Sequence, residues 1–201
     1  MTVKPILFAT PMVKAILKGD KTETRRIIKP QPPNSPEGSL ETTSYGVAFA
    51  EWRGMPAELS YRAPYCSGDV LYVRETWAEW VGGYVYKADD ISAYPHSFVD
   101  RWHPSIHMPK EAARIFLCVT GVQAERLQEI TEDGAQREGF YPGWTSRRGS
   151  TPALTARQGF MWMWQYLTHA GPYEHTWPAN PWVWVTSFER CEKPEAWPCC
   201  E

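Results

Sequence analysis

Short runs of β-branched and aromatic residues, separated by glycine, proline and polar residues, constrain the fold of this chain most. VLYVRETW follows the turn at Gly68 and Asp69, and YVYKA, ARIFLCVTGVQAERL and PWVWVTSFERC lie further along. Runs of this length and composition are typical of β-strands. The longest of them, residues 113–127, predicts the central strand of a sheet.

Three other segments show helical spacing. ILFATPMVKAILKG predicts a strand and then a helix, with Pro11 in the first turn and Gly19 as the left-handed stop. ITEDGAQREGF predicts a short helix that begins after Thr131 as N-cap and ends at Gly139. RQGFMWMWQYLTH predicts an aromatic helix. Its apolar stripe contains Phe160, Met163, Trp164 and Leu167.

These elements predict a single α+β domain over residues 1–201, arranged as a small barrel with flanking helices rather than as a doubly wound sheet. Residues 30–67 are rich in Pro, Ser, Gly and Thr and predict an inserted loop. Residues 141–157 predict a second polar loop. No GxGxxG motif or Walker lysine loop is present in the sequence, so dinucleotide and nucleoside triphosphate sites are not indicated.

Composition narrows the functional classes. The formal net charge of −2 gives no global positive field for nucleic acid, and the sequence has no apolar run long enough to span a membrane. The start of the chain lacks the pattern of a secretory signal. Five irregularly spaced cysteines without a CxxC motif indicate a reducing cytoplasm, and we expect neither a metal nor a cofactor. The eleven tryptophans favour core packing over base stacking.

Charge is nevertheless concentrated locally. Residues 14–29 contain six Lys or Arg and two acidic residues, a local charge of +4. Residues 122–138 contain five acidic residues and two Arg, a local charge of −3. The two segments could face each other, each could be a solvated surface, or the basic one could serve chemistry.

Three residues within these segments suggest catalysis. Lys21 lies beside Arg25 and Arg26, and neighbouring cations lower the pKa of a lysine until it can act as a base. Thr24 supplies a hydroxyl that such a base can activate. Glu138 falls at the end of the predicted helix, where the helix dipole disfavours a carboxylate, so it is a candidate proton donor.

The pattern Gly19-x-Lys21-Thr22-x-Thr24-x-Arg26, the strand SGDVLYVRE and the unit LQEITEDGAQREGF together resemble the ASCH domain. This domain is a compact β-barrel similar to the PUA RNA-binding domain, and the chain resembles in particular the longer ASCH proteins of prophages. The likeness covers residues 4–29, 67–90, 112–140 and 180–190.

Within that superfamily, the small bacterial N4-acetylcytidine amidohydrolases are similar at Lys21, Thr24 and Glu138. The resemblance implies hydrolysis of the amide at the exocyclic amine of an acylated cytidine. Lys21 would be the base, Thr24 the nucleophile or water-positioning group, and Glu138 an acid and base. Arg26 would steady the oxyanion or the pyrimidine carbonyl. Those enzymes are much shorter, so the two predicted loops could reshape the substrate pocket.

Further candidates for substrate binding lie on the strand YVRETW. Arg74 and Glu75 point to opposite faces of a strand, and Trp77 shares a face with Glu75 and could stack on a base. An ion pair beside a packed tryptophan is the structural alternative. Arg147 and Arg148 could contact phosphates or belong to a solvated loop.

Two other functions stay open. The basic segment and the many aromatic residues also fit a non-catalytic RNA- or DNA-binding module of the PUA type. A metal-dependent ribonuclease of the same fold is a third hypothesis, although the sequence offers no clear carboxylate cluster for two metals. The expected partner is therefore a modified nucleoside or RNA, and no membrane.

Overall fold

A computed structural model describes residues 2–32, 39–42, 47–52, 55–80, 83–89, 99, 101–145 and 152–195. In this part of the chain, strands β1 to β10 and helices α1 to α3 give a mixed α+β architecture, which confirms the predicted class. The chain divides into two compact units that exchange segments along the sequence.

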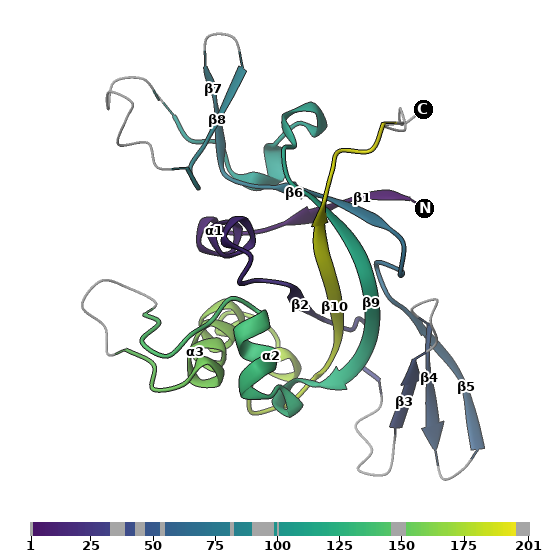
Figure 1. The fold of residues 1–201 in the computed structure, drawn as a ribbon. Helices are drawn as coiled ribbons and strands as arrows, with labels where there is room; N and C mark the ends of the chain where they lie inside the picture. Colours follow the sequence, from purple (N-terminus) through teal and green to yellow (C-terminus); the bar gives the residue numbers. More distant parts are fainter. Residues whose placement is uncertain are drawn as a thin grey trace. The chain divides into compact units, whose positions relative to one another are not determined.

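The first unit comprises Met1–Gly19, Gly68–Val119 and Glu189–Glu201. Its elements are β1 (Val3–Leu7), α1 (Thr10–Lys18), β6 (Val70–Arg74), β7 (Trp77–Trp80), β8 (Gly83–Tyr86) and the beginning of β9 (Phe116–Arg126). β1 pairs with β6 in parallel, β6 with β9 in antiparallel orientation, and β7 with β8 in a hairpin (Figure 1). α1 ends at Gly19, whose φ of 89° is the left-handed stop that the sequence predicts.

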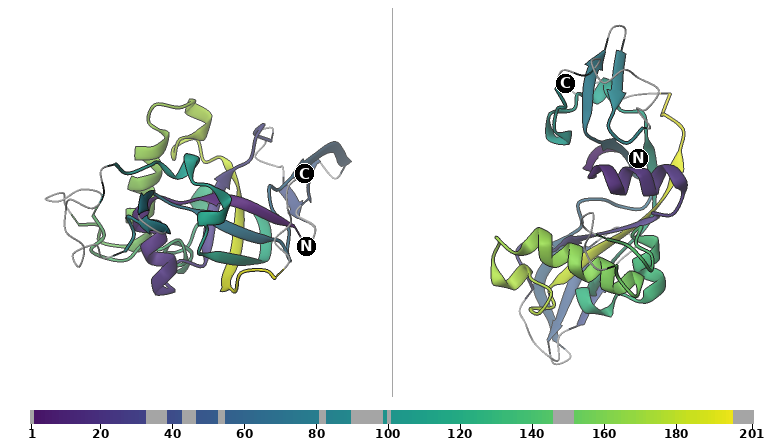
Figure 2. Two further views of the ribbon diagram at one scale, coloured as in Figure 1. Left: turned by 90° about the horizontal axis from the view of Figure 1, so that it is seen from above. Right: turned by 90° about the vertical axis from the view of Figure 1, so that its left-hand side faces the viewer.

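The second unit comprises Asp20–Ser67 and Thr120–Phe188. Its elements are β2 (Glu23–Ile27), β3 (Ser39–Thr42), β4 (Val47–Trp52), β5 (Met55–Arg62), α2 (Glu132–Arg137), α3 (Ala156–Thr168), the rest of β9 and most of β10 (Trp182–Cys191). β10 lies between β9 and β2, and β2 pairs with it in antiparallel orientation. Figures 1 and 2 show α2 and α3 side by side in this unit.

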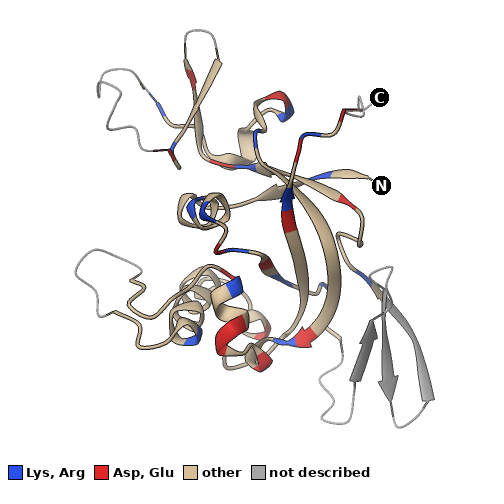
Figure 3. Ribbon diagram, in the orientation of Figure 1, with Lys and Arg blue, Asp and Glu red and all other residues tan. Residues whose placement is uncertain are grey.

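Local signals set the ends of α2. Thr131 is its N-cap, and the side chain accepts a hydrogen bond from Gly134 N at 3.0 Å. Gly139 follows the C-cap Glu138 with a φ of 92°. The helix has acidic residues in its first turn and Arg137 in its last, as the helix dipole favours (Figure 3). The sequence therefore predicts this helix correctly.

Aromatic side chains fill the interior, as expected. In the first unit, Trp77 and Tyr86 pack with Met108 and Phe116. In the second unit, Tyr61 packs with Ile28, Trp182 and Trp184. A further group surrounds α3. It contains Phe140, Trp144, Phe160, Trp164 and Trp177. Leu167 departs from the predicted stripe of α3, because the last turn of the helix leaves it 69% exposed.

The prediction of a loop over residues 30–67 is wrong for its described part. β3, β4 and β5 form a three-stranded antiparallel meander there (Figure 1). The sequence signal for a strand is the alternation in β5. Its apolar residues at 55, 57, 59 and 61 are separated by Pro, Glu and Ser and followed by Arg. The many turn residues around the strands led to the prediction of a loop in spite of this alternation. In the segment 141–157, irregular backbone does precede α3, and residues 146–151, with Arg147 and Arg148, lie outside the described residues.

The predicted small barrel is not confirmed. A closed barrel pairs its first strand with its last, whereas the hydrogen-bonded order of the largest described sheet begins at β1 and ends at β2. The meander and the β7-β8 hairpin are sheets of their own. The described strands therefore form open sheets. None of the described helices has the length and apolar character needed to cross a bilayer.

Candidate active site around Lys21 and Glu138

The backbone brings Lys21 to the end of α2. Lys21 and Glu138 form an isolated antiparallel bridge, and Thr22 N donates to Arg137 O at 2.8 Å. On the other side, Phe188 N of β10 donates to Thr22 O at 2.9 Å. The residues before β2 are therefore held between α2 and β10, within the second unit.

The amino group of Lys21 is buried among acceptors. Its Nζ donates to Glu23 O at 2.7 Å, to Glu138 O at 3.0 Å and to the carboxylate oxygen Oε2 of Glu138. Only 3% of Lys21 is exposed. Burial lowers the pKa of Lys21, the carboxylate of Glu138 opposes that change, and the charges of Arg26 and Arg25 add to the lowering. The predicted direction is therefore found, with burial rather than the arginines as its main cause.

Glu138 presents two different carboxylate oxygens. Oε2 contacts Lys21, whereas Oε1 is buried and has no hydrogen-bond partner among the described residues. Nη1 of Arg25 lies 3.5 Å from Oε1. Buried polar atoms are almost always hydrogen-bonded, so an open acceptor next to a buried amine marks a place for a ligand or water.

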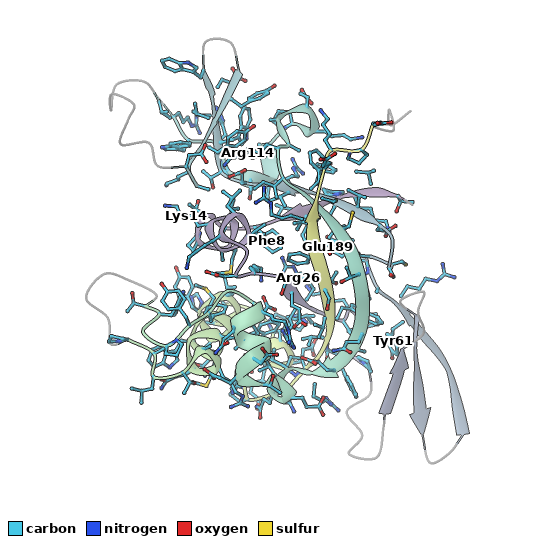
Figure 4. The ribbon with its side chains drawn as sticks, viewed as in Figure 1. Phe8, Lys14, Arg26, Tyr61, Arg114 and Glu189 are labelled. Atoms are coloured by element: carbon cyan, nitrogen blue, oxygen red, sulfur yellow. The ribbon has the colours of Figure 1, made fainter. Side chains whose placement is uncertain are left out.

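Thr24 and Arg26 occupy alternate positions of β2. Thr24 is 1% exposed, and its Oγ1 accepts a hydrogen bond from Nη1 of Arg26 at 2.7 Å. The same Nη1 donates to Arg25 O at 2.9 Å, while the Arg26 residue as a whole is exposed (Figure 4 labels it on β2). The charge of Arg26 also contributes to lowering the pKa of Lys21.

Tyr65 belongs to the same neighbourhood and was not predicted. Burial raises the pKa of its phenol, and the charge of Arg26 opposes that change, so ring and guanidinium are close enough to interact. The residue stands in the stretch RAPYCSG, which has no motif that marks it. A half-buried phenol next to an arginine is a suitable contact for a planar polar ligand.

Arg74, Glu75 and Trp77 belong to the first unit, where each has a structural partner. Nε of Arg74 donates to Met108 O at 3.0 Å. Glu75 is 1% exposed, and Nε of Arg114 donates to it at 2.9 Å. Burial raises the pKa of Glu75, which the Arg114 guanidinium opposes. Trp77 is 5% exposed and stacks on His103 with 4.9 Å between ring centroids. These contacts match the structural alternative, an ion pair beside a packed tryptophan.

The basic and acidic segments partly face each other, as one reading of the sequence expected. Nε of Arg25 lies 2.8 Å from Oε1 of Glu125, and Lys21 pairs with Glu138. Both pairs belong to the second unit. One joins β2 to the segment 122–138, and the other joins Lys21, two residues before β2, to the same segment. The sequence missed Arg25 and Glu125 as a pair, because it gives no distance between two segments so far apart.

Within the part of the chain that the structure describes, no three His, Cys, Asp or Glu side chains converge to hold a metal ion. Cys199 and Cys200 lie outside that part. Comparisons of the chain with protein-family models, curated proteins and solved structures find no match. The evidence on function therefore comes from the geometry around Lys21 and Glu138.

Proposed function

We propose that the protein is a cytoplasmic hydrolase that removes the acyl group from the exocyclic amine of N4-acetylcytidine or a related nucleoside. We assign it to the ASCH group of PUA-like proteins on the motif around Lys21. The observation that carries the proposal is the buried pair of Lys21 and Glu138, in which burial lowers the lysine pKa. A buried lysine with a lowered pKa beside a carboxylate is typical of functional sites, whereas a lysine on the surface keeps its ordinary pKa.

The first chemical step is attack on the acyl carbon. The ammonium of Lys21 first passes one proton to the Glu138 carboxylate with which it shares a hydrogen bond. The neutral amine then takes a proton from the hydroxyl of Thr24 or from a water molecule, and the oxygen forms a bond to that carbon. The Arg26 guanidinium that donates to Thr24 Oγ1 stabilises negative charge on the hydroxyl oxygen as its proton leaves. It is also the exposed cation that can meet the oxyanion of the tetrahedral intermediate.

The second step is departure of the amine. The bond between the acyl carbon and the exocyclic nitrogen breaks, and the nitrogen needs a proton to leave as the free amine. Lys21 and Glu138 share a hydrogen bond, so one of them can deliver the proton taken in the first step. If Thr24 is the nucleophile, water then releases the acyl group as a carboxylic acid.

The test is incubation of the purified protein with N4-acetylcytidine, with cytidine release followed by chromatography. Lys21→Ala should abolish release, whereas Lys87→Ala, an exposed lysine of the first unit, should not change it. Thr24→Val separates two roles from each other. It abolishes release if the hydroxyl is the nucleophile and leaves a residual rate if it positions water. Lack of release by the folded wild-type protein would overturn the proposal.

A second candidate function, RNA binding, rests on α1. Arg190 Nη1 donates to Leu17 O at 3.4 Å, which places Arg190 at the C-terminal end of α1 with Lys18, one turn after Lys14. Figure 3 shows the basic residues of α1. Such a group binds phosphates through charge, so a gel shift with RNA should weaken steeply as salt increases. Absence of a shift at low salt would exclude this candidate.

A further inference from the structure

Arg25 is a buried charge of the second unit with several acidic partners. It is 5% exposed, and its side chain approaches carboxylates from three elements. Nε lies 2.8 Å from Glu125 of β9, and Nη1 lies 3.5 Å from both Glu23 of β2 and Glu138 at the end of α2. The planar guanidinium can bind several acceptors at once because its donors are fixed in a fork.

Strand geometry explains why Arg25 faces this way. Side chains of an extended chain alternate, so Glu23 and Arg25 share one face of β2. Nε of Arg137 also donates to Glu23, at 2.8 Å. With Lys21, the group contains three cations and four carboxylates, of which Asp133 is exposed. Its members are Lys21, Arg25, Arg137, Glu23, Glu125, Glu138 and Asp133. Each buried charge of the group thus has an opposite charge beside it.

The helix backbone leaves room for the guanidinium. A Cβ at Gly134 would lie 3.1 Å from Nη2 of Arg25 and 3.3 Å from Oγ1 of Thr131. The approach of Arg25 to α2 therefore depends on a residue without a side chain at this position. Phe160 of α3 lies on another side of Arg25, with its ring centroid 6.0 Å from Cζ. The arginine is thus held by β2, β9, α2 and α3.

We infer that Arg25 is a positioning residue for the proposed deacylation, because its guanidinium lies beside Oε1 of the Glu138 carboxylate and so keeps Oε2 directed toward Lys21. The inference rests on the proposed function for its catalytic meaning. Arg25 itself touches no reacting atom. It acts through Glu138, at 3.5 Å, and through its charge on Lys21.

Removing Arg25 should change the pKa of Lys21 in a definite direction. The charge of Arg25 is one cause that lowers the Lys21 pKa, and its loss also leaves the negative charge of Glu138, which raises that pKa, without its second cation. Both changes favour the ammonium form. In Arg25→Gln the Lys21 pKa should therefore rise, the ascending limb on the acid side of the pH profile should move to higher pH, and kcat should fall about 100-fold with little change in KM. Arg25→Lys should restore part of kcat.

The experiment compares wild type, Arg25→Gln and Arg25→Lys by NMR titration of the Lys21 side chain and by cytidine release. Arg157→Gln is the control, because Arg157 donates to Ile130 O and Gln128 O in the same unit and has no role at the site. If Arg25→Gln does not fold, Gly134→Ala displaces the guanidinium without removing it and should change both quantities in the same direction. A folded variant of either kind with the wild-type Lys21 pKa would overturn the inference. If the wild type releases no cytidine, the proposed function fails, while the NMR titration still decides the role of Arg25.

Discussion

The amino group of Lys21 donates to Glu138 twice, to its backbone carbonyl at 3.0 Å and to its carboxylate. One contact joins the chain before β2 to the end of α2 whatever the charge on Glu138, and the other depends on that charge. Geometry and protonation are therefore coupled at a single nitrogen. The pH dependence of the protein should report this coupling directly.

Unfolding should depend on pH through Lys21. Because burial lowers its pKa in the folded state, the unfolded chain binds more protons between that lowered pKa and 10.5. The free energy of unfolding should then increase with pH in this window, by at most about 1.4 kcal/mol per pH unit. Urea denaturation of wild type and Lys21→Met at several pH values measures it. An equal slope in both proteins would contradict the assignment to Lys21.

Glu138→Gln should move the Lys21 pKa the other way from Arg25→Gln. The carboxylate of Glu138 raises the lysine pKa, so the amide should let it fall further. We expect deacylation to decrease by about 100-fold or more, since the pair loses its exchangeable proton. NMR titration and cytidine release measure the two effects, with the exposed Glu174→Gln as control. A higher Lys21 pKa in the variant would refute the pairing.

Gly134→Ala should destabilise the protein although alanine is the better helix former. The new Cβ would meet Nη2 of Arg25 at 3.1 Å, and displacing the guanidinium disturbs the contact of its Nε with Glu125. We expect a loss of about 1–3 kcal/mol, typical of overpacking. Gln136→Ala, at an exposed position of the same helix, should have no such cost. Equal unfolding midpoints for the two variants would argue against the close approach.

Gly19→Ala tests the backbone stop of α1 alone. No atom lies within 4 Å of the added Cβ, but φ is 89°. The cost should therefore be conformational, about 1–2 kcal/mol. Gly83→Ala also adds a Cβ in open space, without a positive φ, and should be nearly neutral. Thermal unfolding of the two variants gives the comparison.

Glu132 should act as a pH-sensitive cap of α3. Its carboxylate accepts from Ala156 N at 2.6 Å and from Arg157 N at 3.0 Å, and these hydrogen bonds lower its pKa below 4.5. A carboxyl of lowered pKa stabilises the fold above its unfolded pKa and ceases to do so as pH falls through the folded pKa. The protection factors of the two amides against hydrogen exchange should fall in acid, and in Glu132→Gln at neutral pH. Unchanged protection would contradict this role.

Local chemistry explains what the sequence could predict. Gly19 and Gly139 mark the ends of α1 and α2, and Thr131 marks the start of α2, because each stands directly beside its helix. All three residues act as predicted. Lys21 and Glu138 were singled out by neighbouring charges and by the position at a helix end, and again by the resemblance, but the sequence did not predict their contact. The alternation of β5 was visible in the sequence, and the turn residues around it were given too much weight.

The rest depends on distances between remote segments. Arg25 meets Glu125 across one hundred positions, and no periodicity of either segment predicts that encounter. Burial of Glu75 and Trp77 has the same origin, because Arg114 and His103 approach them from elsewhere in the chain. Single-sequence patterns describe faces of elements. The choice of which faces meet is made by packing.

The shared face of Glu23 and Arg25 has a consequence for how this segment can vary. Any substitution changes one side chain, but a deletion or insertion of one residue between Lys21 and Arg25 reverses the direction of every side chain beyond it. Arg25 would then point to the side that Thr24 and Arg26 now occupy, and the carboxylates would lose their cation together. The spacing of these residues should therefore tolerate no change in length, even where their identities can be exchanged.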